Sequence, residues 1–397
     1  MEVITDIKRI HEIFERGIVR EVLPSLDALY ELFTSGRRLK IYIGVDPTST
    51  SLHLSHAKNY MFLEELRLLG HEVIVLFGDF TARIGDPSER SEARKQLTSQ
   101  QTNENVQEWL RQIKPLMDFS ASDNPPKIAH NSTWLAPLVF EDILSLASNF
   151  TVQQMLERDM FQKRIKQDKP IYLHEFMYPL MQGYDSVALD VDIELCGGDQ
   201  IFNALVGRTL VKRFKDKEKF VIALNLMENP VTGELMSKSK GIGVFLSSPP
   251  AEMFGEIMSQ PDEMIEVFYI NNTRLPLSDK EKFLSVGPRR AKADIAFEIV
   301  KSMYGENTAK EASEEFEKVF ARGALPEEMQ TFAVRGNARD LRETLKASGM
   351  VSSKSEAQRL IEQGGVSVNG AAVRDWNVDH CAGDVIKVGP RRFLKIV

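Results

Sequence analysis

Two runs of almost unbroken apolar residues, separated by one helical segment, constrain the fold of this chain most strongly. The runs span residues 39–45 and 73–78, and residues 52–69 between them carry apolar side chains at helical spacing. Strands with Val, Ile and Leu on both faces are typical of a parallel sheet that helices cover, and a strand, a helix and a strand in this order build such a sheet. Ligands bind at the carboxyl ends of these strands. We therefore expect the loops after Val45 and Phe77 to border one crevice.

The middle of the chain extends this pattern and then changes to helices. Residues 141–167 have a helical pattern, residues 220–224 read as a strand, and residues 229–243 form a loop rich in Gly, Ser and Lys. After two consecutive prolines the pattern is helical from residue 250 to about residue 320, with a break near residues 274–276. The sequence thus predicts an α/β domain with a parallel sheet, followed by an all-α domain.

A third pattern begins near Arg339 and predicts a small α/β module. Two short helical stretches lead to a strand at residues 366–368, an Asn369-Gly370 turn and alternating segments up to the last residue. Residues 331–397 carry eleven Lys and Arg against seven Asp and Glu, a net +4, which leaves −11 for the first 330 residues of a chain whose total is −7. A basic module on an acidic body is compatible with a localised RNA contact, whereas the negative total argues against non-specific coating of nucleic acid such as DNA.

Length and composition set further bounds. A chain of 397 residues with 43% apolar residues can bury a core in two or three domains. It begins without a basic segment followed by an apolar one, and it has no run of 18 apolar residues, so we expect a soluble, cytoplasmic protein without a membrane partner. Cys196 and Cys381 are the only cysteines, which favours reduced thiols and predicts neither a disulfide framework nor a metal site.

A pair of histidines marks the first candidate site. His53 and His56 open the helix that follows the first predicted strand, and the N-terminus of a helix favours phosphate because its N–H groups are unpaired. The alternative is that both histidines merely decorate a helix start. Their position directly after a parallel strand favours a nucleotide-phosphate site.

A loop with two lysines marks the second candidate site. Lys238 and Lys240 lie in the segment 236–241, and mobile ammonium groups can close over a triphosphate. A loop of this composition is more often only solvated. Its occurrence together with the histidine pair favours the functional interpretation.

Several motifs in one order resemble the class I aminoacyl-tRNA synthetases and, more narrowly, the tyrosyl enzymes of bacteria. The resemblance covers nearly the whole chain, and motifs that agree in order and spacing are more specific than any one alone. The last module resembles the S4 RNA-binding domain through residues 352–361 and 364–370. The other motifs lie at residues 42–56, 84–88, 178–185, 197–200 and 236–239.

The resemblance implies a role for each matched residue. For tyrosine it implies Tyr42 and Asp185 at the phenol, Asp86, Tyr178 and Gln182 at the α-ammonium, and Gln200 near the carboxylate. The residues that it implies for ATP are Gly44, Asp46, Thr48, His53, His56, Asp199, Met236, Ser237, Lys238 and Ser239. Among these, Thr48, His53, His56 and Lys238 would assist catalysis at the phosphates.

The resemblance also implies a reaction and its partners. Tyrosine would be activated with ATP, with Mg²⁺ on the pyrophosphate, and then transferred to tRNA(Tyr) by a homodimer whose interface includes residues 136–164. The implied architecture is a Rossmann-like catalytic domain at residues 1–228, a mobile loop at 229–246, a helical tRNA-binding domain at 247–330 and an S4-like domain at 336–397.

Three positions depart from the family pattern. Ser55 stands where the histidine motif has a Gly against which adenine packs, Leu235 stands where the lysine loop begins with Lys, and Cys196 stands where a Gly begins the ribose-binding turn. Three alternatives stay open: a tryptophanyl enzyme of the same fold, a non-catalytic relative that binds RNA, which these departures make conceivable, and a metabolite nucleotidyltransferase of the same superfamily.

Overall fold

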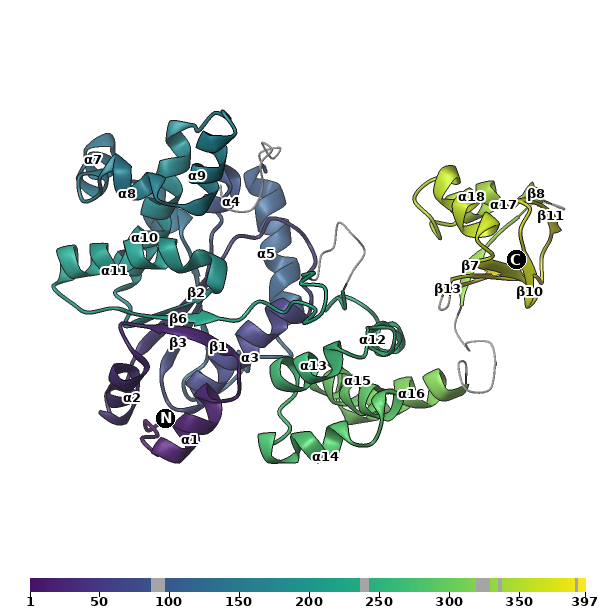
Figure 1. Cartoon of the computed structure of the whole chain (residues 1–397), viewed down its shortest axis with the longest axis horizontal. Coiled ribbons are helices and arrows are strands. Elements are labelled where there is room, and N and C mark those ends of the chain that lie inside the picture. Colours follow the sequence, from purple (N-terminus) through teal and green to yellow (C-terminus); the bar gives the residue numbers. More distant parts are fainter. Residues whose placement is uncertain (87–96, 236–242, 319–328, 335–337, 390–391) are drawn as a thin grey trace. The chain divides into compact units, whose positions relative to one another are not determined.

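The structure is a computed structural model, and it describes residues 1–86, 97–235, 243–318, 329–334, 338–389 and 392–397. The chain forms two compact units, Met1–Ala309 and Lys310–Val397 (Figure 1). In the described residues no helix has the length and apolar character needed to span a membrane.

A six-stranded sheet forms the centre of the larger unit, with the strand order β1-β6-β5-β2-β3-β4. All neighbouring strands are parallel except β1 and β6, which are antiparallel. The predicted parallel strand–helix–strand unit is therefore confirmed. The strands are β1 (Val19–Leu23), β2 (Lys40–Val45), β3 (Glu72–Phe77), β4 (Lys127–His130), β5 (Ile193–Gly197) and β6 (Phe220–Leu224).

The order of the strands creates a position for a ligand. From β2 the chain proceeds outward to β3 and β4, and it then returns to place β5 on the other side of β2. Such a reversal opens a crevice beyond the carboxyl ends of the two central strands. In this chain the crevice therefore lies after Val45 and Gly197, the last residues of β2 and β5.

Helices cover the sheet on both sides. In Figure 1, α10 and α11 lie together above the sheet, and α1 and α2 lie below it. Gly183 of α10 makes the close packing possible, because a Cβ there would be 2.9 Å from Val206 and from Leu210 of α11. The helices of this part are α1 (Ile7–Phe14), α2 (Leu26–Thr34), α3 (Leu54–Leu68), α4 (Thr81–Ile84), α5 (Ser99–Ile113), α6 (Ser132–Leu135), α10 (Met177–Leu189) and α11 (Ile201–Lys215).

The helical pattern expected at residues 141–167 is confirmed, and it is divided among separate helices. Three helices occupy it, namely α7 (Phe140–Ala147), α8 (Val152–Leu156) and α9 (Asp159–Lys166). The Thr151 side chain accepts a hydrogen bond from the backbone N–H of Gln154, and this cap starts α8 as a new helix. The apolar periodicity of the sequence continues across this point, so it does not reveal a helix boundary that depends on one capping side chain.

Five helices follow the sheet within the larger unit and at its end: α12 (Pro250–Met258), α13 (Met264–Asn272), α14 (Lys280–Leu284), α15 (Pro288–Tyr304) and α16 (Glu306–Phe316). Both α12 and α15 begin with proline, which suits the first helical position because no N–H is needed there. The predicted break after α13 is confirmed. The Arg16 guanidinium donates to the carbonyl oxygens of Tyr269, Ile270, Thr273 and Leu275, and it thereby joins these helices to the sheet domain.

Beyond the end of α16, the described residues of the smaller unit form a five-stranded sheet, a two-stranded sheet and the helices α17 and α18. The strand order of the larger sheet is β10-β9-β12-β13-β7. Asn369 and Gly370, with φ of 52° and 83°, join β9 to β10 in the predicted turn. The elements are β7 (Gln330–Phe332), β8 (Ala338–Asp340), α17 (Leu341–Ala347), α18 (Lys354–Glu362), β9 (Val366–Val368), β10 (Ala371–Val373), β11 (Asn377–His380), β12 (Val385–Val388) and β13 (Arg392–Ile396).

Candidate active site

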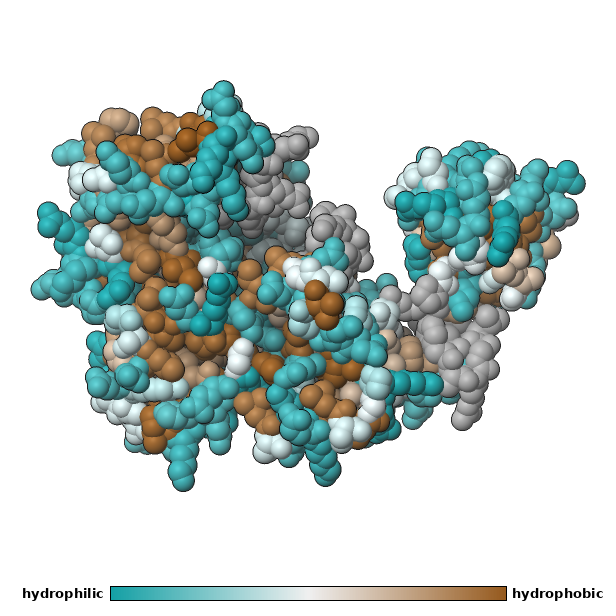
Figure 2. All heavy atoms as spheres, in the orientation of Figure 1, coloured by the Kyte–Doolittle hydropathy of each residue, from teal (hydrophilic) through white to brown (hydrophobic). Residues whose placement is uncertain are grey.

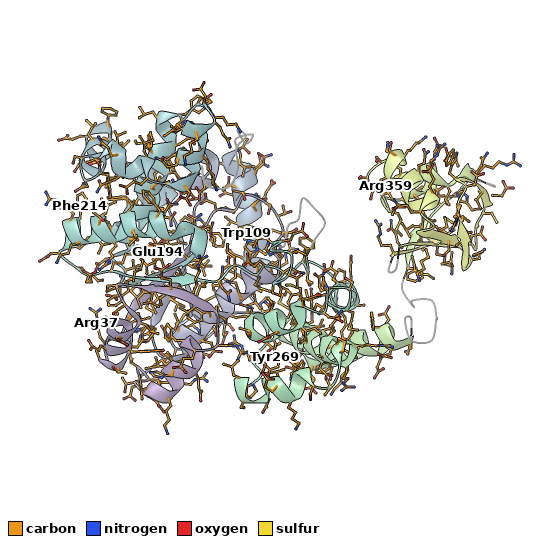
Figure 3. The ribbon with its side chains drawn as sticks, viewed as in Figure 1. Arg37, Trp109, Glu194, Phe214, Tyr269 and Arg359 are labelled. Carbon is orange, nitrogen blue, oxygen red and sulfur yellow. The ribbon has the colours of Figure 1, made fainter. Side chains whose placement is uncertain are left out.

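A cavity of 290 Å³ lies at the carboxyl ends of β2 and β5, where the strand order predicts a ligand. Figure 3 shows Glu194, from β5, near the middle of the larger unit and Trp109 on α5; both side chains line this cavity. Ten of the residues that the sequence assigned to tyrosine or ATP also line it. They are Gly44, Asp46, Thr48, His56, Asp86, Tyr178, Gln182, Asp185, Asp199 and Gln200.

The Asp46 carboxylate connects two elements at the cavity. Its Oδ1 accepts a hydrogen bond from Thr81 Oγ1 at 2.7 Å, and its Oδ2 accepts one from the Tyr178 hydroxyl at 2.8 Å. Asp46 follows β2, whereas Tyr178 belongs to α10. The carboxylate therefore fixes the tyrosine hydroxyl at the wall of the cavity.

Gly78 leaves the space that this carboxylate occupies. A Cβ at position 78 would be 2.0 Å from Asp46 Oδ1 and 2.3 Å from Thr81 Oγ1. We expect Gly78→Ala to displace the carboxylate and to lower the free energy of unfolding by about 1–3 kcal/mol, as overpacking does. Urea unfolding followed by circular dichroism measures this change. An unchanged unfolding midpoint would show that the Asp46 carboxylate can move without a loss of stability.

Two amide side chains hold carboxylates at the same wall. Gln200 Nε2 donates to Asp86 Oδ2 at 2.9 Å, and Gln182 Nε2 donates to Glu194 Oε1 at 2.9 Å. Gln200 Oε1 in turn accepts a hydrogen bond from Asn203. Asp86, Gln182 and Gln200, three residues that the sequence assigned to the amino acid, thus line one cavity with fixed side chains.

Tyr42 and Asp185 lie differently from the expected phenol-binding pair. Asp185 lines the cavity, and its Oδ1 accepts a hydrogen bond from Trp134 Nε1 at 2.7 Å. Tyr42 is fully buried, is not among the lining residues, and has its hydroxyl 2.9 Å from Ser186 Oγ. Burial raises the pKa of the Asp185 carboxyl well above its usual range. Asp185 is thus the member of the pair that a ligand in this cavity would meet.

Both motif histidines are neutral at physiological pH. Burial lowers the pKa of His53 to about 4 and that of His56 to about 3. The His53 backbone N–H donates to His56 Nδ1 at 3.3 Å, so the proton of the neutral His56 ring resides on Nε2. His56 lines the cavity, whereas His53 caps α3 and is not a lining residue. His56 can therefore act there as a neutral hydrogen-bond donor.

The lysine loop is only partly described. Met236, Ser237, Lys238 and Ser239 lie outside the described residues. Leu235, which precedes them, is 45% exposed.

Comparisons with known proteins identify the family of this chain. Residues 34–321 match the family model described as "tRNA synthetases class I (W and Y)", and residues 341–386 match the S4 domain. A tyrosine–tRNA ligase of Carboxydothermus hydrogenoformans is 40% identical and covers 99% of both chains. The chain belongs to the tyrosine–tRNA ligase family.

A second relative and one solved structure extend these comparisons. The tyrosine–tRNA ligase of Thermotoga maritima is 38% identical over 97% of this chain and 96% of its own length. A C-terminally truncated mitochondrial tyrosyl-tRNA synthetase of Aspergillus nidulans has the same fold, with a TM-score of 0.67, 23% identity, and coverage of 79% of this chain and 94% of its own.

Sequence reasoning assigned no role to several polar and charged residues of the cavity, and three of them stand out. Lys58, Asn131 and Glu194 line it and were not assigned a role. One signal was available for Lys58, because it follows Leu54 and Ala57 at positions of α3 that face the core, where a lysine is rare. Glu194 interrupts the apolar run of β5, and a charge in a buried strand is a similar signal.

Proposed function

We propose that this chain activates L-tyrosine with ATP and transfers the tyrosyl group to the 3′ end of tRNA(Tyr). The observation that supports the proposal most strongly is that ten motif residues, from four separate stretches of the sequence, line one cavity. Family membership and the S4 domain support the same function.

We assign the amino acid to the wall formed by α10 and the loop after α4. Asp86, Tyr178 and Gln182 would hold the α-ammonium, Asp185 would meet the phenol, and Gln200 would lie near the carboxylate. Tyr42 would affect the phenol indirectly, through the Ser186 hydroxyl that it contacts. The nucleotide would take the other wall, with Gly44, Asp46, Thr48, His56 and Asp199. We propose that His53, Met236, Ser237, Lys238 and Ser239 also contribute to ATP binding.

The reaction has two steps in this cavity. A tyrosine carboxylate oxygen attacks the α-phosphorus of ATP, an O–P bond forms, and pyrophosphate leaves with the electrons of the broken bond. The terminal ribose hydroxyl of tRNA then attacks the acyl carbon, and AMP leaves. Neither step requires a protein nucleophile, so the residues act by positioning and by hydrogen bonds to developing charge.

Two residues illustrate what the chain contributes to the first step. His56 would donate from Nε2 to a phosphate oxygen, and Lys238 would bring a positive charge to the leaving pyrophosphate. We propose that Mg²⁺ enters with ATP on its phosphate oxygens, and we assign no protein residue to it.

We propose four regions with separate tasks. Residues 1–228 would bind tyrosine and ATP, residues 229–246 would close over the phosphates, residues 247–330 would bind tRNA, and residues 336–397 would provide a further RNA contact. The protein would act in the cytoplasm.

The S4 module should contribute to tRNA charging and not to adenylate formation. We expect a variant that ends at Met329 to keep tyrosine-dependent pyrophosphate exchange within about threefold and to lose tRNA charging by about a hundredfold or more, because phosphate contacts by basic side chains supply much of RNA affinity. Both rates are measured on the same preparation. An equal loss of both activities would mean that the module supports the catalytic fold.

An exposed apolar surface supports a homodimer. Val139, Phe140, Leu144 and Val152 are exposed, and Phe140 is 74% exposed. Figure 2 shows hydrophobic residues at the upper left of the larger unit, where Figure 1 has α7, α8 and α9. Large apolar patches mark interaction surfaces. We propose that residues 136–164 contribute to the contact between two copies of this chain.

Pyrophosphate exchange with tyrosine, phenylalanine and tryptophan, run in parallel, tests the proposed function. Exchange that depends on tyrosine supports it. Exchange with tryptophan alone would identify the other enzyme of the same family model, and the absence of exchange with every amino acid would favour a non-catalytic RNA-binding protein.

A further inference from the structure

Acidic side chains outnumber basic ones among the residues that line the cavity, although Lys219 pairs with Glu194 from behind the wall and Arg158 lies 4.0 Å from Asp86. Five carboxylates line it, and among the described lining residues Lys58 is the one lysine or arginine. His56 adds no positive charge, because its pKa is about 3. The carboxylates are Asp46, Asp86, Asp185, Glu194 and Asp199.

Lys58 projects from the first turns of α3, directly after the histidine motif, and is 2% exposed. Its Nζ donates one hydrogen bond, to Asn59 Oδ1 at 2.9 Å. An ammonium group has three donors, and burial of a charge that is only partly paired costs free energy. A buried lysine that lines a cavity and donates one hydrogen bond there points to a ligand that accepts hydrogen bonds from its other donors.

The groups around Lys58 indicate which part of the ligand it would meet. Lys58 interacts electrostatically with both Asp199 and His56. In the proposed function Asp199 contacts the ribose and His56 the phosphates. The α-phosphate joins these two parts of ATP.

We propose that Lys58 binds the α-phosphate of the nucleotide and remains bound to it in the tyrosyl-adenylate. This inference rests on the proposed function and assigns one more residue to it. Lys58 belongs to a 15-residue helix and not to a loop, so its charge is held in position before the reaction begins. In the family pattern a lysine stands at the position of Leu235 and adds positive charge to the phosphate site. Lys58 would supply part of that charge in this chain.

Binding of AMP and of adenosine separates a phosphate contact from every other role. We expect Lys58→Met to weaken AMP binding by about tenfold to a hundredfold, the range for a charge-assisted hydrogen bond, while adenosine binding stays within about threefold. Lys58→Arg should restore part of the AMP affinity. Lys212→Met, which removes an exposed lysine from α11, is the matched control. Calorimetry measures all four proteins, and their thermal unfolding identifies a variant that does not fold.

Three results would overturn the proposal. Equal weakening of AMP and adenosine would assign Lys58 to the ribose or the base, unchanged binding of both would make it structural, and weakening of tyrosine alone would assign it to the amino acid. None of these binding results depends on catalysis. A wild-type protein that binds AMP better than adenosine but fails to exchange pyrophosphate would contradict the proposed function and not the role of Lys58.

The pH dependence of AMP binding gives an independent readout. Burial lowers the pKa of Lys58 to about 7 in the empty cavity, and a bound phosphate would raise it. Below pH 7 the ammonium is already charged. Above pH 7 binding must first take up a proton, so the affinity for AMP should fall with rising pH by up to about tenfold per unit.

Other groups around Lys58 do not produce this decline. His53 and His56 remain neutral across the range, and burial raises the pKa of the Cys196 thiol well above its usual value. The second ionisation of a phosphate monoester is complete by about pH 7, since its pKa is about 6. Lys58→Arg should therefore bind AMP equally well from pH 7 to 9, and a decline in that variant as steep as in the wild type would overturn the assignment.

Discussion

Lys219→Met is expected to lower the free energy of unfolding of the larger unit by about 3–5 kcal/mol, because it leaves a carboxylate buried without its counter-ion. The Lys219 ammonium is fully buried and pairs with Glu194, whose side chain is 2% exposed. Nζ also donates to the Ala204 carbonyl oxygen at 3.1 Å, so the charge is held from two sides. Urea unfolding followed by circular dichroism measures the loss.

A double variant distinguishes the loss of the ion pair from the loss of side-chain packing. Lys219→Met combined with Glu194→Gln removes both charges and should recover most of the stability, since the penalty arises from the unpaired charge. A single variant as stable as the wild type, or a double variant no better than the single one, would show that the ion pair does not stabilise the fold.

The same ion pair supports the amino-acid wall of the cavity. Glu194 accepts hydrogen bonds from Gln182 at 2.9 Å and from Ser186 at 3.3 Å, and Ser186 contacts the Tyr42 hydroxyl. Lys219, although it does not line the cavity, is thus connected through Glu194 to side chains from both β2 and α10. A buried network of this kind fixes side-chain orientation only while each member keeps its partner.

Local patterns predicted the centre of the fold, whereas the resemblance to a family supplied the ten assigned residues of the cavity wall. The strand 220–224 and the βαβ unit follow from apolar runs, and the loops after Val45 and Phe77 were expected at one crevice because parallel strands end at the same edge. These inferences require only periodicity and strand direction. Both are properties of short segments.

What the sequence did not predict depends on distant contacts. The partners Lys219 and Glu194 lie 25 residues apart and meet only after β5 and β6 pair. The buried position of Tyr42 depends on its packing with Ile74, Leu76 and Val191 from other elements. Periodicity places a side chain on one face of a strand, but it does not decide whether a cavity reaches that side chain.

Asp185→Ala is expected to weaken tyrosine binding by about tenfold to a hundredfold, because it would leave the buried phenol hydroxyl without its hydrogen-bond acceptor. The carboxylate is buried at the cavity wall, with Oδ1 held by Trp134 Nε1 and Oδ2 3.3 Å from Asn131 Nδ2. Both donors fix its orientation before a ligand arrives. A phenol hydroxyl would donate to this acceptor, whereas phenylalanine has nothing to donate.

The preference for tyrosine over phenylalanine separates this role from a structural one. In Asp185→Ala the KM for tyrosine in pyrophosphate exchange should rise, while the KM for phenylalanine and that for ATP stay within about threefold, because only the hydroxyl loses a partner. Asp185→Asn keeps the size and one acceptor oxygen, so it should lose less. Thermal unfolding of both variants controls for the partners that Trp134 and Asn131 lose. If Asp185→Ala folds and keeps the wild-type ratio of tyrosine to phenylalanine, Asp185 does not recognise the phenol, and the specificity must come from another residue of this wall.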